Sequence, residues 1–209
     1  MKLIDISVPI HDAMTVYRGN PPVRIRPANT IDTDGVSLSE ICLGTHTGTH
    51  VDAPNHFIKG ARGVDRLDLN LFVGPAWIAD LRTVKTAIGA EALEGARIPR
   101  GMSRVLFRTK NSRLWHPARA FTTEFVYLAP DGADWLVERG VRLVGIDYLS
   151  IEGFHVTGAP THKRLLGAGV PIVEGLDLFR ITPGRWQMVA LPLRIEGGDA
   201  GLTRAVLWK

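Results

Sequence analysis

The sequence predicts one mixed α/β domain, because strand-like segments at both ends of the chain surround a strand–helix–strand unit in its second half. No linker, repeat or low-complexity segment divides the chain. A length of 209 residues is sufficient for one sizeable core. We therefore expect a single α/β domain with a mixed sheet over residues 1–209.

The first half of the chain is expected to be rich in strands. Residues 2–8 and 23–26 alternate as strands do, and residues 36–45 form a third strand that leads into a group of histidines. Between the first two strands lies a loop rich in proline and glycine, with Tyr17 and Arg18 at its centre. The single cysteine, Cys42, is expected to be a small core residue.

The middle of the chain and the second half complete the sheet. We expect one or two helical turns at residues 65–72 and a strand at 75–81. A short helix at 89–95 and a strand at 104–109 follow. Next come a strand at 125–128, a helix at 131–139 and a strand at 141–147. This order predicts that the two strands are parallel and that the helix connects them in a right-handed crossover. The remaining elements are a helix at 160–167, a strand at 170–174 and an antiparallel hairpin of 186–193 with 204–208 around the turn 197–201.

Composition and charge exclude several classes of protein. No run of 18 apolar residues occurs, so we expect no membrane span, and the acidic Asp5 argues against a signal peptide, which indicates a cytoplasmic protein. The net charge is +4, but the basic residues are scattered and no nucleic-acid motif is present. We expect a small-molecule partner and no nucleic acid.

The chemistry is concentrated in residues 46–56. His46, His50, Asp52 and His56 all occupy even positions, so an extended strand running into a turn would direct them to one side. A regular helix is disfavoured by Gly48 and by the proline at position 54. Imidazole and carboxylate are the usual ligands of Zn²⁺ or Mn²⁺, whereas a lone histidine on a loop would more simply be a hydrogen-bonding group.

A second pair of candidate ligands lies further along the chain. His162 stands at the start of the helix at 160–167, and Glu174 ends the following strand. A helix–turn–strand unit folds back, so both residues can approach one site. Taken singly, His162 could equally cap the helix and Glu174 could be a solvated carboxylate.

These residues resemble the cyclase-like metal hydrolases, a family that includes bacterial kynurenine formamidases and isatin hydrolases. The fingerprint H-x-G-T-H-x-D-x-P-x-H matches residues 46–56 at every fixed position, and His162 and Glu174 match the second ligand pair of the family. Similarity extends to Gly-Ile-Asp at 145–147 and to the closing segments 191–193 and 204–207, so it covers most of the chain.

The resemblance implies a set of roles. One ion would be held by His46, His50 and Asp52, while Asp52 would bridge to a second ion held by His162 and Glu174. The ions would be Zn²⁺, one or two in number, with Mn²⁺ as an alternative. The family fold is a swivelling β/β/α domain, which usually forms a homodimer with the site near the interface.

His56 would then be the general base and acid rather than a ligand. Its unperturbed pKa of about 6.5 suits the transfer of a proton from water to a leaving amine.

Substrate selection is where the sequence departs from the formamidases. Their Trp-Pro-Gly-Asp segment is replaced by Tyr-Arg-Gly-Asn at 17–20, and their x-Pro-Ser after Gly-Ile-Asp is replaced by Tyr-Leu-Ser at 148–150. Candidate substrate contacts are Tyr17, Arg18, Tyr148 and His155.

Three functions are therefore compared. The first is a hydrolase of aryl formamides such as N-formylkynurenine. The second is a hydrolase of a cyclic amide or lactone, as the isatin hydrolases are. The third is a non-catalytic metal-binding protein, in which His56 would be one more ligand.

Overall fold

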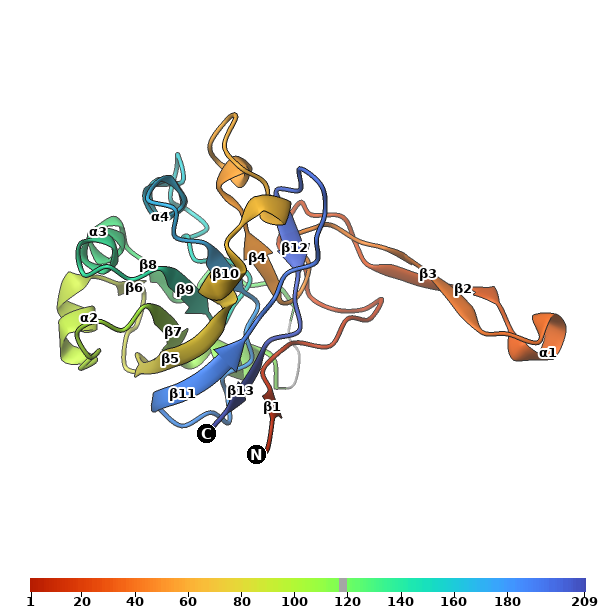
Figure 1. Cartoon of the computed structure of the whole chain (residues 1–209), viewed down its shortest axis with the longest axis horizontal. Coiled ribbons are helices and arrows are strands. Elements are labelled where there is room, and N and C mark those ends of the chain that lie inside the picture. Colours follow the sequence, from red (N-terminus) through yellow and green to blue (C-terminus); the bar gives the residue numbers. More distant parts are fainter. Residues whose placement is uncertain (117–119) are drawn as a thin grey trace.

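The computed structural model describes residues 1–116 and 120–209, and nine strands from these ranges form one curled sheet in the order β1-β13-β11-β5-β7-β9-β10-β4-β12 (Figure 1). Four neighbouring strands at its centre are parallel: β5 (Val73–Asp80), β7 (Arg104–Arg108), β9 (Leu143–Ile146) and β10 (Ile172–Glu174). The remaining strands pair in antiparallel fashion: β1 (Ile4–Asp5), β4 (His50–Asp52), β11 (Gly184–Val189), β12 (Ala200–Leu202) and β13 (Val206–Trp208). The expected mixed sheet is confirmed.

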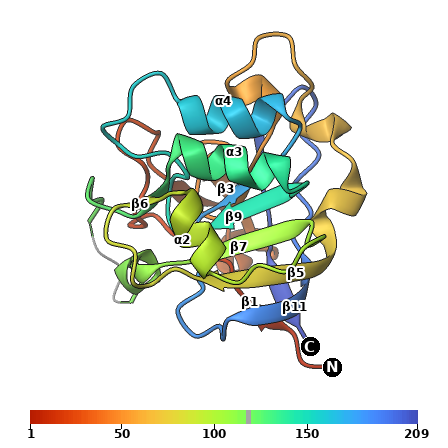
Figure 2. The ribbon, with the colours of Figure 1, turned by 90° about the vertical axis from the view of Figure 1, so that its left-hand side faces the viewer.

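Three helices cover one face of this sheet: α2 (Ala90–Gly95), α3 (Pro130–Glu138) and α4 (Pro160–Gly167) (Figure 2). Along the buried strand β7, Val105 and Phe107 pack in the cluster beneath the helices with Leu136 and Leu165, whereas Leu106 packs in the cluster on the other face. This alternation is the period of a strand with both faces covered. Among the described residues, no helix has the length and apolar character needed to cross a bilayer.

Short 3-10 helices connect the larger elements: η1 (Pro54–His56), η2 (Val64–Arg66), η3 (Leu69–Phe72) and η4 (Lys110–Leu114). The helical turns expected at residues 65–72 correspond to η2 and η3. The helices expected at 89–95 and 160–167 are present as α2 and α4, and that expected at 131–139 is α3.

A hairpin arm projects from the body of the molecule (Figure 1). It consists of β2 (Arg24–Asn29), the short helix α1 (Ile31–Asp34) and β3 (Leu38–Cys42), and β3 is exposed along its whole length. The strand expected at residues 36–45 is present as β3, but it pairs with β2 in a separate two-stranded sheet and not in the main sheet. Cys42 is exposed rather than buried in a core, because the periodicity of a strand does not specify whether another element covers it.

The expected crossover at residues 125–147 is also different in the structure. β8 (Tyr127–Leu128) pairs with β6 (Ala87–Ile88) in a separate two-stranded sheet, so the two strands that flank α3 do not share a sheet. β9 instead has β7 and β10 as its parallel neighbours.

The closing hairpin is confirmed, because β11 and β13 are antiparallel neighbours. The segment between them is more than a turn. It contains β12, which pairs with β4 and so brings the end of the chain to the histidine segment.

Candidate metal centre

The pairing of β4 with β10 forms the centre of the site. Their antiparallel register places His50 directly opposite Glu174. The Nε2 atom of His50 lies 3.6 Å from Glu174 Oε2 and 3.2 Å from Asp52 Oδ1. His50 and Asp52 are two residues apart on one strand, so their side chains share a face. The regular strand covers only His50–Asp52 of the stretch. His46 reaches the site from a turn and His56 from the 3-10 helix η1.

His46 comes from the turn before β4, and its Nδ1 atom lies 2.8 Å from Asp52 Oδ1. Within this turn Gly48 has a φ of +62°, a conformation that glycine adopts without strain. Gly175, which follows β10, has a φ of +68°, and an added Cβ there would overlap the carbonyl oxygen of Gly48. The end of β10 can therefore pass against the histidine turn only with glycine at position 175.

His162 lies in the first turn of α4. Its Nε2 atom is 3.4 Å from Glu174 Oε1 and 3.6 Å from Asp52 Oδ2. Glu152 accepts hydrogen bonds from the backbone nitrogens of Thr161 (3.4 Å) and His162 (3.1 Å), and its Oε2 lies 3.1 Å from His162 Nδ1. Glu152 therefore holds the start of the helix, where a negative charge is favourable, and also directs the imidazole.

His56 is the last residue of η1, which begins at Pro54. Its ring stacks on that of His46 at a centroid distance of 3.9 Å and contacts Phe57 at 4.2 Å. Burial lowers the pKa of His56 to about 4, against the opposing effect of the Asp52 charge. His56 is therefore neutral at pH 7 and can accept a proton.

Burial and the neighbouring charged groups set the other pKa values. Burial opposes the charged form of His50, but the nearby Asp52 carboxylate outweighs it and raises the pKa to about 9. For His162, burial is likewise outweighed by Glu152 and Glu174, and the pKa rises to about 10. Burial raises the pKa of Asp52, but the neighbouring imidazoles of His46 and His50 hold it well below its usual value. These carboxylates therefore favour positive charge at the centre.

The donor set fits divalent cations. Among the described residues, three groups have ligand atoms that all lie within 4.8 Å of one another: His46 with His50 and Asp52, Asp52 with His162 and Glu174, and His46 with His56 and Asp199. Buried atoms with no hydrogen-bond partner among the described residues include His50 Nε2 and both carboxylate oxygens of Asp52. Unpartnered buried donors and acceptors are costly, and coordination to a cation would satisfy them.

A cavity of about 290 Å³ opens beside these groups, with His46, His56, His162 and Glu174 in its wall. The rest of the wall is mostly aromatic and aliphatic and includes Tyr17, Phe57, Leu149, Phe154 and Val156. An apolar pocket with a few convergent polar groups is typical of a small-molecule site.

Of the four candidate substrate contacts, the structure places only Tyr17 in the cavity wall. The guanidinium of Arg18 lies 5.2 Å from the ring centroid of Phe154, just behind the wall. Tyr148 is buried beneath this region, and its ring packs on Phe125 at 5.1 Å. The side chain of His155 is 72% exposed and faces Glu124, outside the cavity.

Two carboxylates at the site were missed by the sequence analysis. Glu152 lies ten residues before His162 and directs its ring. Asp199 lies in the glycine-rich segment before β12, and its Oδ2 atom is 3.5 Å from His46 Nε2. The one available signal for Asp199 was an acidic residue among glycines, which is typical of an ordinary turn.

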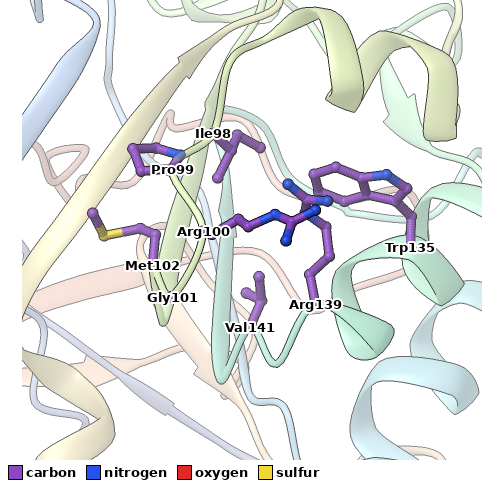
Figure 3. Close-up of a pocket in the computed structure, with 8 residues that line it drawn as sticks. All are labelled: Ile98, Pro99, Arg100, Gly101, Met102, Trp135, Arg139 and Val141. Atoms are coloured by element: carbon purple, nitrogen blue, oxygen red, sulfur yellow. The ribbon is translucent and has the colours of Figure 1, made fainter.

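A second cavity, of about 250 Å³, lies between the loop at residues 98–102 and the end of α3 (Figure 3). The guanidinium of Arg139 stacks on Trp135 there, 4.3 Å from the ring centroid. This cavity shares no residue with the histidine site.

Comparisons with known proteins agree with this geometry. The chain is 38% identical to the kynurenine formamidase of Salinibacter ruber over 99% of this chain and 97% of that protein. A solved structure described as a potential metal-dependent hydrolase with cyclase activity superimposes with a TM-score of 0.86, at 39% identity, over 99% of this chain and 96% of that one. Isatin hydrolase A from Labrenzia aggregata has the same fold, with a TM-score of 0.84 at 24% identity, over 99% and 93% of the two chains.

The family model described as a putative cyclase matches residues 4–153. That range contains the whole 46–56 fingerprint, and the match to the curated relative covers 99% of the chain. The chain therefore belongs to the cyclase family.

Proposed function

We propose that this amidohydrolase of the cyclase family cleaves aryl formamides, such as N-formylkynurenine, to formate and the free amine. The observation that carries the proposal is the position of Asp52 beside a cavity with an aromatic wall: its Oδ1 atom faces His46 and His50, and its Oδ2 atom faces His162. The similarity to kynurenine formamidases over nearly the whole chain supports the choice of substrate class.

The five buried or half-buried donors would hold the metal. His46 and His50 face Asp52 Oδ1, and His162 faces Asp52 Oδ2 together with Glu174. This division would allow Asp52 to bridge two ions, since a carboxylate has an oxygen for each. Zinc fits the nitrogen and oxygen donors, and manganese is the alternative. A bound divalent cation lowers the pKa of its water and polarises a carbonyl oxygen.

The role of His56 follows from its position and its charge state. It is neutral at pH 7 and lies in the cavity wall beside His46. It would accept a proton from the attacking water and return it to the nitrogen of the leaving amine as the C–N bond breaks. The reaction thus consumes one water molecule and yields formate and amine.

The cavity would receive the aromatic ring of the substrate between Tyr17, Phe57 and Phe154. Arg18 stacks on Phe154 at the edge of this region, and it would attract a carboxylate carried by the substrate.

We propose in addition that the chain forms a homodimer in which the hairpin arm packs on a second copy. The arm exposes Ile31, Val36, Leu38 and Ile41, each with more than half of its area accessible. A two-stranded hairpin without a covering layer is marginally stable in water. A second copy would supply that layer.

The test is a panel of N-formylkynurenine, formanilide, isatin and a lactone, offered to zinc-loaded and manganese-loaded protein whose metal content is known. We expect formate release from the two formamides. Ring opening of isatin or the lactone without formate release from the formamides would assign the site to cyclic substrates. Full metal content with no turnover of any substrate would favour a non-catalytic metal protein.

A further inference from the structure

The two nitrogens of each ligand histidine have different surroundings. A neutral imidazole that gives one nitrogen to a cation carries its proton on the other, and an acceptor behind the ring fixes this arrangement. The Nδ1 atom of His50 lies 3.0 Å from the carbonyl oxygen of Gly48, and that of His162 lies 3.1 Å from Glu152. In both rings Nε2 is left to face the carboxylates of the centre.

His46 is oriented the other way round. Its Nδ1 atom faces Asp52, so Nε2 is the outer nitrogen. This atom is buried and has no hydrogen-bond partner among the described residues. It faces Asp199 Oδ2 at 3.5 Å. The third ligand ring therefore also has an oxygen behind it.

Asp199 is held in place by its other atoms. Its Oδ1 accepts hydrogen bonds from Thr45 Oγ1 (2.9 Å) and from the backbone nitrogen of Ala200 (3.0 Å). Its carbonyl oxygen accepts a hydrogen bond from the backbone nitrogen of Ala53 (2.9 Å). Only Oδ2 remains for the imidazole of His46.

The segment that carries Asp199 is fixed to the segment that carries His56. Gly198 accepts a hydrogen bond from the backbone of Val64 (2.9 Å), and Gly197 accepts one from the side chain of Asn55 (3.0 Å). One nitrogen each of His46 and His56 and one oxygen of Asp199 lie within 4.8 Å of one another. The carboxylate therefore lies beside both rings of the stacked pair.

We propose that Asp199 is a positioning residue for the metal: it accepts the outer N–H of His46 and thereby holds Nδ1 of that ring toward the centre. The proposal rests on the proposed function, because it assigns a role toward the same ions. It gives a role in metal binding to Asp199, which is not itself one of the proposed ligands.

The experiment compares zinc affinity in the wild type, Asp199→Asn and Asp199→Ala by competition with a chromogenic chelator at pH 7. Loss of a carboxylate behind a ligand histidine lowers metal affinity by about 10- to 100-fold. We expect that loss for Asp199→Ala and a smaller one for Asp199→Asn, which keeps a neutral acceptor oxygen. Thr45→Val, which leaves the carboxylate but removes the hydroxyl that fixes it, should shift the affinity in the same direction by less.

The matched control is Asp177→Ala. Asp177 forms a similar pair with His116, whose Nε2 atom lies 2.6 Å from Asp177 Oδ2, and neither residue belongs to a group of candidate ligands among the described residues. Its removal should leave zinc affinity unchanged. The visible spectrum of the cobalt-loaded protein gives a second readout, which should change in the Asp199 variants and stay unchanged in the control.

Three outcomes overturn the proposal. Zinc affinity of Asp199→Ala within twofold of the wild type, with an unchanged cobalt spectrum, would overturn it and leave the proposed function intact. Equal losses in Asp199→Ala and Asp177→Ala would show a general structural effect and would also overturn it. A wild-type protein that binds no zinc or manganese would overturn the proposed function as well.

Discussion

His50 and Glu174 face each other across the β4–β10 pair, with 3.6 Å between His50 Nε2 and Glu174 Oε2, and each belongs to a different group of candidate ligands. The two groups are joined through Asp52. The metal content of a variant can therefore distinguish a residue that belongs to one group from Asp52, which belongs to both.

Removal of Glu174 and of Asp52 should have different consequences. Glu174 belongs to one group, so Glu174→Ala should lose about one of two ions, whereas Asp52→Ala should lose both. Elemental analysis after dialysis against a fixed concentration of free zinc measures the difference. Equal metal content in the two variants would contradict the shared role of Asp52.

His56→Ala should keep its metal and lose turnover. The residue lies in the cavity wall and is neutral at pH 7, so its loss removes the proton carrier and should lower kcat by about 10²- to 10⁴-fold. Formate release and metal content should be measured on the same samples, with His50→Ala as the variant that loses metal. If His56→Ala lost as much metal as His50→Ala, then His56 would be a ligand.

Binding of metal should release protons. The pKa values of about 9 for His50 and about 10 for His162 mean that both rings are protonated at pH 7 in the metal-free protein. Ligation requires neutral rings, so about two protons should leave when the site fills at pH 7. Calorimetry in buffers of different ionisation enthalpy counts them, and apparent zinc affinity should rise with pH up to about 10.

The same raised pKa values affect the stability of the metal-free protein. The folded pKa of each ring lies above the unfolded value of about 6.5. The contribution of His50 and His162 to the free energy of unfolding is therefore complete below pH 6.5. It is lost as the pH rises through about 9 to 10. Thermal unfolding of chelator-treated protein should show this decline, and zinc should abolish it.

Gly175→Ala should destabilise the protein more than Gly140→Ala. Both glycines have a positive φ, +68° and +73°, which costs about 1–2 kcal/mol for alanine. A Cβ at Gly140 would meet nothing within 4 Å, whereas one at Gly175 would overlap the Gly48 carbonyl oxygen and add roughly 1–3 kcal/mol. Denaturant unfolding of the two variants separates the conformational cost from the overlap. Equal losses would mean that β10 does not approach the histidine turn this closely.

Ile41→Glu should convert the dimer to a monomer if the arm packs on a second copy. The matched control is Leu69→Glu, because the two residues have almost the same exposure, 60% for Ile41 and 61% for Leu69, and Leu69 lies in η3 outside the arm. Light scattering coupled to size-exclusion chromatography measures the mass. A wild-type monomer, or a dimer that survives the substitution of Ile41, would contradict the assigned role of the arm.

The sequence was most informative where spacing alone determines geometry. The two-residue separation of His50 and Asp52 places both side chains on one face of any strand, and the helix that starts at Pro160 brings His162 toward Glu174. These relationships depend on local periodicity, so they can be predicted from the sequence.

Features that depend on pairing over long distances could not be predicted. Asp199 reaches His46 only because β12 pairs with β4, and nothing local in a glycine-rich segment specifies that partner. The strand-like pattern of residues 36–45 is equally compatible with the main sheet and with the exposed arm.

The place of β4 in the sheet has a consequence for synthesis of the protein. β4 lies between β10 and β12, so residues 172–174 and 200–202 must leave the ribosome before both edges of the strand with His50 and Asp52 are paired. Until then the backbone groups along an edge of β4 are unpaired, and an open strand edge can pair with other chains. The metal centre can therefore assemble fully only after residues 200–202 have been synthesised, and products that stop before them would keep an open strand edge.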